Sequence, residues 1–115
     1  MSFHFVLKRS GWGYDDVYEA VKSGRKPSEW RDASDHWIRR LLNEEGVSLL
    51  ETFNSGYEKL DELCFLPYYW KYTKARFVVG YTKSPMLVAE VTGIIYHRDT
   101  EQFEVQIKNV VEVET

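Results

Sequence analysis

Three ionisable side chains lie close together in one short segment of the chain: Lys26, Glu29 and Arg31. A carboxylate in such a group can act as a general base, and a lysine near a second cation can act as a base or a nucleophile. The same residue types also form purely structural ion pairs, in which Glu29 binds Lys26 or Arg31. The sequence leaves both interpretations open and makes Lys26 and Glu29 the candidate catalytic pair.

Large aromatic side chains and a further arginine flank this segment. Trp30 and Trp37 can stack on a nucleobase or form the wall of a pocket, while Arg31 and Arg40 can bind phosphates or base edges. Tyr81, from a strand predicted later in the chain, joins them as a candidate ligand-binding residue. The combination predicts a polar pocket with aromatic walls.

The elements before this segment are predicted from periodicity. Residues 3–8 alternate apolar and polar side chains, as a half-buried strand does, and residues 9–13 are predicted to form a loop. Apolar side chains from Tyr14 to Val21 recur at helical spacing, so a helix is expected there. This helix should end at Gly24, because glycine readily takes the left-handed conformation that terminates helices.

Pro27 directs the chain into an extended path, because its ring fixes φ and disfavours a helical conformation at the residue before it. The next four residues are predicted to form a strand. Alternation in this strand places Ser28 and Trp30 on one face and Glu29 and Arg31 on the other.

A second helix is predicted to follow, with Asp32 or Ser34 as its N-cap. Trp37 and Leu41 lie on its apolar stripe, so we expect them above all to pack in the core. Arg40 lies at the edge of this stripe, where its head group can reach a pocket while its stem packs.

The second half of the chain is predicted to be mostly β. Two short helices, residues 47–53 and 57–63, are expected first, with a turn between them. Residues 67–74 interleave aromatics with lysines, a pattern typical either of a loop that covers a core or of a surface that stacks bases. Strands follow at residues 75–81, 86–96 and 103–113, with a turn at 82–85, a bulge at Gly93 and a hairpin loop at 97–100. The fold class is therefore α+β, with a small, mostly antiparallel and barrel-like sheet and helices packed over it.

Length and composition predict one globular domain over residues 1–115. One cysteine, Cys64, fits a reducing cytoplasm, and no run is apolar enough to suggest a membrane span. The net charge of −3 argues against a general nucleic-acid coat, but the charges are segregated. Basic residues dominate segments 22–40 and 68–83, and acidic residues dominate segment 41–67. If the fold joins the two basic segments, they form one positive face for an anionic ligand.

Most signatures of known chemistry are absent from the sequence. It contains no HExxH, CxxC, P-loop, GxGxxG or GxSxG motif. The three histidines, His4, His36 and His97, are scattered and have no cysteine cluster nearby. We therefore expect neither a metal site nor a cofactor.

Several motifs match a known family: Gly24-Arg25-Lys26, Glu29-Trp30-Arg31, Trp37-Ile38-x-Arg40-Leu41 and, later, Phe77-Val78-Val79-Gly80-Tyr81, Val88 to Ile94 and Phe103 to Val113. In these stretches the chain resembles the ASCH family of small PUA-like domains, whereas residues 43–74 do not match its pattern. The resemblance implies a small β-barrel with a cleft beside the Gly-x-Lys and Glu-x-Arg segment, and a ligand that is RNA or a modified nucleoside.

Some bacterial relatives in that family hydrolyse the amide of N4-acetylcytidine with a lysine, a threonine and a glutamate. Aligned on Gly-Arg-Lys, this chain keeps the lysine as Lys26 and has Glu29 in the place of the threonine. The resemblance suggests Glu90 for the later glutamate.

Three hypotheses follow for the function. The first is a module that binds RNA or a nucleoside or nucleotide, and the second is an amidohydrolase acting on an acylated nucleoside. The third is a module that binds a protein partner through residues 43–74.

Overall fold

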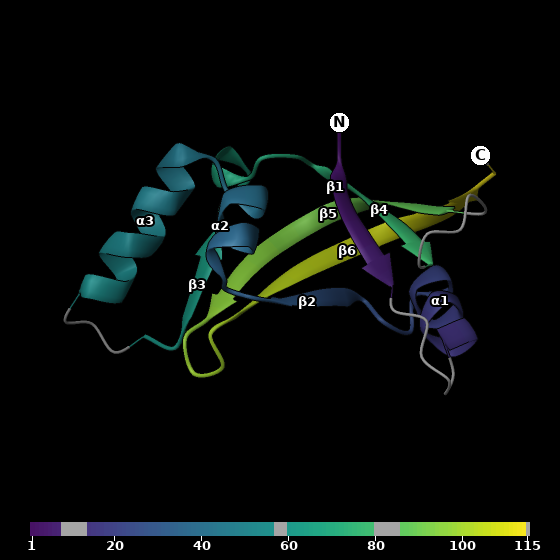
Figure 1. Cartoon of the computed structure of the whole chain (residues 1–115), viewed down its shortest axis with the longest axis horizontal. Coiled ribbons are helices and arrows are strands. Elements are labelled where there is room, and N and C mark those ends of the chain that lie inside the picture. Colours follow the sequence, from purple (N-terminus) through teal and green to yellow (C-terminus); the bar gives the residue numbers. More distant parts are fainter. Residues whose placement is uncertain (8–13, 57–59, 80–85, 115) are drawn as a thin grey trace.

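The computed structural model describes residues 1–7, 14–56, 60–79 and 86–114, with the backbone alone for residues 14–16 (Figure 1). Its elements in chain order are β1 (Phe3–Leu7), α1 (Tyr14–Ser23), β2 (Ser28–Asp32), α2 (Asp35–Leu41), α3 (Glu44–Ser55), β3 (Glu62–Phe65), the 3-10 helix η1 (Pro67–Tyr69), β4 (Lys74–Val79), β5 (Met86–His97) and β6 (Gln102–Val113). None of the helices within these ranges is long and apolar enough to cross a membrane.

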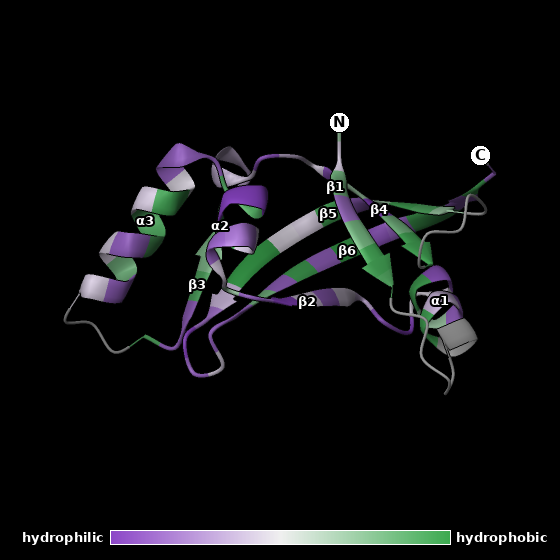
Figure 2. Ribbon diagram, viewed as in Figure 1, coloured by the Kyte–Doolittle hydropathy of each residue, from purple (hydrophilic) through white to green (hydrophobic). Residues whose placement is uncertain are grey.

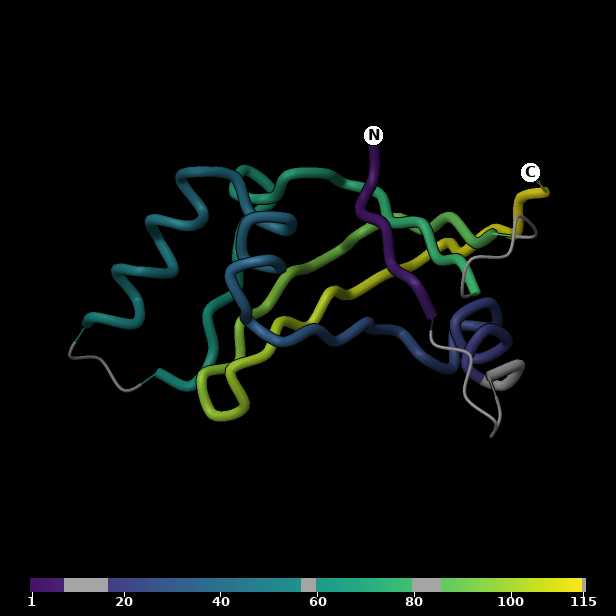
Figure 3. Tube along the Cα trace, viewed as in Figure 1, coloured from purple at the N-terminus to yellow at the C-terminus, as the bar shows by residue number. Residues whose placement is uncertain are grey.

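The strands form one curled sheet in the order β1-β4-β5-β6-β2, with β3 paired to the far half of β5. β1 runs parallel to β4, and the other pairs are antiparallel. The long strands β5 and β6 cross the molecule side by side, and β1 and β2 are the two edges of the path (Figure 3). The predicted α+β class with a mostly antiparallel sheet is confirmed, and the sheet curls into a half-barrel.

The bulge predicted at Gly93 is present and helps to curl the sheet. The register between β5 and β6 shifts between Val88 and Glu90 and again between Val91 and Gly93. A Cβ at Gly93 would clash with the end of the Gln106 side chain, so glycine leaves room for that side chain over the bulge. Because bulges bend a strand and increase its twist, these shifts turn the sheet on itself.

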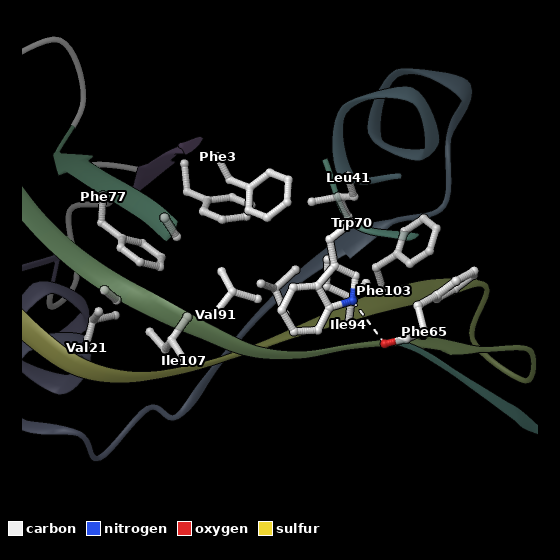
Figure 4. Packing of buried hydrophobic residues seen from close by; sticks show 14 of the residues in the cluster. Phe3, Val21, Leu41, Phe65, Trp70, Phe77, Val91, Ile94, Phe103 and Ile107 are labelled. Atoms are coloured by element: carbon white, nitrogen blue, oxygen red, sulfur yellow. Dashed lines mark hydrogen bonds between the residues drawn. The ribbon is translucent and has the colours of Figure 1, made fainter. Parts of the chain in front are cut away.

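The concave side of the sheet holds an aromatic and aliphatic core (Figure 4). Phe5, Phe77 and Phe103 are completely buried, as the alternation of their strands predicts. Trp70 packs among these core side chains, and its indole Nε1–H donates to the carbonyl of Phe65 at 3.0 Å. Residues 67–74 therefore cover the core at this point, which is one of the two roles that the sequence suggested. β2 is hydrophilic along most of its length, in contrast with β1 and β4 (Figure 2).

The two helices that flank the candidate segment end and begin at the predicted signals. α1 stops before Gly24, whose φ is +84°. The hydroxyl of Tyr18 donates to Glu112 at 2.6 Å and holds α1 against β6. Of the two candidate caps of α2, Ser34 is the one used, since its hydroxyl accepts from the backbone N–H of Trp37 at 3.4 Å.

The prediction for residues 43–67 is partly wrong. α3 runs without a break from Glu44 to Ser55, although a turn was expected at residues 54–56. The described part of the second predicted helix is a coil followed by β3, in which Leu63 pairs with Tyr96. A short apolar run is ambiguous between helix and strand, and the open edge of β5 decides it in favour of a strand. The predicted loop at 9–13 and turn at 82–85 lie outside the described residues.

Candidate functional site

A pocket of about 890 Å³, here called the main pocket, lies between β1, β2 and α2. It is bordered by six of the seven candidate residues: Lys26, Glu29, Trp30, Arg31, Trp37 and Arg40. The seventh, Tyr81, lies outside the part of the chain that the structure describes. His4 also borders the main pocket from β1, where it is exposed as its alternation predicts. The fold thus gathers into one hollow residues that the sequence spreads from position 4 to position 40.

Glu29 is the buried centre of this site, with only 5% of its surface exposed. One carboxylate oxygen accepts from Lys26 Nζ at 3.2 Å, and the other forms an ion pair with Arg31. A buried carboxylate is unfavourable unless it is paired in this way. Of the two roles that the sequence left open, the structural ion pair is therefore present, and it engages both cations.

Besides its ion pair with Glu29, the Arg31 guanidinium contacts residues of three elements, β1, β2 and α2. The group lies 5.0 Å from the ring centre of Phe5 and 5.2 Å from that of Trp37. It also donates to the carbonyl of Trp30 at 2.8 Å and to that of Val6, on the edge of β1, at 3.5 Å. Arg31 thereby links β2 to β1 and α2, so its first role is structural.

The two tryptophans have different surroundings. Trp37 stacks on Phe5, with ring centres 5.5 Å apart and an angle of 16° between the planes, and it forms the inner wall of the main pocket. Trp30 borders the pocket as well, but its ring packs 4.8 Å from His97. Both tryptophans therefore contribute aromatic surface to the main pocket, Trp37 from a position fixed by the core.

A second polar cluster, which the sequence analysis did not identify, lies around Glu104 next to β2. Ser28 donates its hydroxyl proton to Glu104 at 2.6 Å, and His97 Nε2 lies 3.0 Å from the same carboxylate. His97 Nδ1 lies 3.5 Å from Glu62 of β3. Alternation in β2 and β6 could have suggested the Ser28–Glu104 contact, but the contribution of His97 depends on how β5 pairs with β6.

The environment of Glu104 has two opposing effects on its ionisation. Burial raises the pKa of this carboxyl group, but hydrogen bonds with Ser28, His97 and Gln106 outweigh burial and lower the pKa below 4.5. The ionised form of Glu104 is therefore stabilised by the fold.

Arg40 differs from Arg31 because its side chain has no ion-pair or hydrogen-bond partner among the described residues. It is exposed on α2 and borders the main pocket. Lys71, from the second basic segment, reaches the same helix and donates to the carbonyl of Arg39 at 2.7 Å. The two basic segments thus meet in part at the end of α2, as the charge pattern suggested.

Two further predicted features lie away from the main pocket. Glu90, which the resemblance suggested as a later catalytic glutamate, is exposed on β5 and accepts from Asn109 at 3.1 Å. The segment of residues 43–74 includes α3, which lies at the end of the molecule opposite α1 (Figure 1). It exposes Leu66 and Tyr68, by 67% and 64%.

Comparison of the chain with family models, curated proteins and solved structures found no match. Within the described ranges, no group of three or more His, Cys, Asp or Glu side chains is placed to hold a metal ion.

Removing the Arg31 guanidinium should destabilise the fold through Glu29. We expect Arg31→Ala to lower the free energy of unfolding by about 1–3 kcal/mol, because a buried carboxylate loses a partner. The loss should be smaller in a Glu29→Gln background, where no carboxylate is left underpaired. Urea denaturation of the wild type, the two single variants and the double variant measures the coupling free energy between Arg31 and Glu29. We expect it to be at least about 0.5 kcal/mol. Strictly additive losses would contradict the role assigned to this pair.

The lowered pKa of Glu104 predicts a specific dependence of stability on pH. The ordinary pKa of a glutamate carboxyl is 4.5, and the contribution of ionised Glu104 to the stability of the fold is present above that pH. This contribution is lost as pH falls through the folded-state pKa, since the unfolded chain binds the proton first. Urea denaturation between about pH 3 and pH 6 should show a shallower slope for Glu104→Gln than for the wild type, and an intermediate slope for Ser28→Ala. Equal slopes in all three proteins would show that the cluster does not bias the ionisation of Glu104.

Proposed function

We propose that the main pocket binds RNA or a nucleoside or nucleotide, and that the chain is a PUA-like domain of the ASCH type. The observation that carries the proposal is the gathering of six candidate residues around one hollow of about 890 Å³. This volume falls within the range of about 300–1,000 Å³ that is usual for small-molecule sites. The curled α+β sheet is compatible with the barrel that the resemblance implies.

The chemistry of the lining fits the edge of a nucleobase. A base edge carries hydrogen-bond donors and acceptors side by side. The main pocket offers the Lys26 ammonium as donor and the Glu29 carboxylate as acceptor, 3.2 Å apart. Trp37 supplies an aromatic wall nearby, of the kind on which unpaired bases stack. A pocket for a purely anionic ligand would not place a buried carboxylate at its centre.

The proposal predicts that a nucleoside, nucleotide or short RNA raises the melting temperature of the protein. A ligand that binds only the folded state stabilises it by about 2.7 kcal/mol at one hundred times its Kd. Lys26→Met should weaken this binding by about tenfold or more, because a charge-assisted hydrogen bond is lost while Arg31 still holds Glu29. Lys22→Met removes the same charge from the end of α1, away from the main pocket, and serves as the matched control.

A thermal-shift screen with the four ribonucleosides, their monophosphates and short RNAs provides the measurement. If no compound shifts the melting temperature, the proposal is wrong. The exposed side chains of Leu66 and Tyr68 then become the place to look for a protein partner. If both lysine variants lose binding equally, the ligand does not occupy the main pocket.

The contact between Lys26 and Glu29 favours one second candidate, hydrolysis of an acylated nucleoside such as N4-acetylcytidine. In this reaction water attacks the acyl carbon, the C–N bond breaks, and acetate and the free amine are released. Lys26 and Glu29 would act as the acid/base pair that transfers the protons in this reaction. Glu29 stands where relatives in the ASCH family use a threonine. Glu90 would take no part from its exposed position on β5.

This second candidate predicts that the wild-type protein releases cytidine from N4-acetylcytidine. Chromatography measures the cytidine that is formed. Product formation should be lost in Glu29→Gln and in Lys26→Met and kept in Lys22→Met. Binding of N4-acetylcytidine without any product would reject the amidohydrolase and leave the binding function intact.

A further inference from the structure

A smaller pocket of about 170 Å³, here called the side pocket, adjoins the main pocket. The two share His4, Trp37 and Arg40 as lining residues, so the same side chains form the boundary between them. Lys71 and Tyr72 border the side pocket from its other side. Its volume is below the roughly 300 Å³ at the lower end of small-molecule sites, so it suits a single chemical group and not a second base.

The two pockets differ in charge. The main pocket is lined by three cations, Lys26, Arg31 and Arg40, against the carboxylates of Glu29 and Asp32. Glu29 already pairs with Lys26 and Arg31. The side pocket is lined by Arg40 and Lys71, and its described lining includes no carboxylate. An anionic group is therefore held better in the side pocket, and an uncharged polar group better in the main one.

Both cations of the side pocket have donors to offer. Arg40 is exposed and engages no acceptor within the described ranges. Lys71 uses one bond, to the carbonyl of Arg39, and an ammonium group can donate three. Tyr72, which also lines the side pocket, is held edge-on against Phe3 with ring centres 5.3 Å apart. An oxyanion in the side pocket could thus receive charge-assisted hydrogen bonds from both Arg40 and Lys71.

We infer that the side pocket is a phosphate subsite and that the ligand is a nucleotide or a single strand of RNA, not a free nucleoside. This inference rests on the proposed function and specifies its substrate class. The base occupies the main pocket against Trp37, and the adjoining phosphate reaches past Arg40 to Lys71. The shared chemistry is a phosphate, either the monoester of a mononucleotide or the diester of a strand.

The test is calorimetric titration of the full chain with cytidine, uridine, adenosine and guanosine, each as nucleoside, 5′- and 3′-monophosphate and homodinucleotide. We expect the phosphate-bearing form of the preferred base to bind about tenfold tighter than its nucleoside. Arg40→Ala should abolish most of this gain, so that the nucleoside and its phosphate bind with similar affinity, and Arg40→Lys should keep part of it. Arg39→Ala is the matched control, because it removes the same charge from the neighbouring residue, which borders neither pocket.

Lys71→Gln and Lys74→Gln form a second matched pair, since Lys74 borders neither pocket. Only Lys71→Gln should reduce the gain. A gain for monophosphates identifies a nucleotide ligand, and a gain confined to dinucleotides identifies a strand. Equal affinity of nucleosides and their phosphates, or an equal loss in Arg39→Ala and Arg40→Ala, would overturn the subsite and leave the proposed function standing. Binding of none of these compounds would instead reject the proposed function.

Discussion

The burial of Glu29 is the constraint on which the rest of the site depends. A carboxylate with so little contact with water must be paired, and its partners come from both directions along the chain. Lys26 reaches it from the turn after α1, and Arg31 from two positions later in β2. Because Arg31 also covers Phe5 and Trp37, this one carboxylate connects the edge of β1 with β2 and α2. The walls of the main pocket are therefore held by the same ion pairs that lie inside it.

This arrangement divides the polar residues of the pocket by role. Arg31 donates to Glu29 and to two backbone carbonyls, so three of its five N–H groups are engaged within the fold. Arg40 sits one helical turn after Trp37 with an exposed head group. Two arginines that look alike in the sequence motif thus differ in their surroundings: Arg31 is held by Glu29 and two carbonyls, and Arg40 has no ion-pair or hydrogen-bond partner among the described residues. Only the first is tied to the stability of the sheet.

The strand β2 is held on both of its faces, and this explains how a hydrophilic strand can sit at a sheet edge. Glu29 and Arg31 anchor one face to β1 and α2, while Ser28 and Trp30 contact the Glu104 and His97 side chains on the other. The bulges in β5 and β6 curl the sheet and bring its two edges within reach of side chains. Arg31 then spans the gap between the two edges through its bond to the carbonyl of Val6.

Local features of this protein are determined by the sequence alone. The alternation of apolar and polar residues predicts β1, and the glycines predict the end of α1 at Gly24 and the bulge at Gly93. The short spacing between Lys26, Glu29 and Trp37 predicts that they share one candidate site. These features depend on the conformational preferences of a few neighbouring residues. Their periodicity needs no knowledge of the partner segments.

Tertiary structure decided everything that requires segments distant in the chain to meet. Residues 62 and 63, which were predicted to end a helix, belong to a strand because β5 offers an unpaired edge. The contact of Arg31 with Val6 and the hydrogen bond of Ser28 with Glu104 each join residues more than twenty positions apart. Arg40 and Lys71, which line the same side pocket, are likewise distant in the chain. Alternation can suggest which side chains share a face, but these pairs exist only once the strands have paired and the sheet has curled.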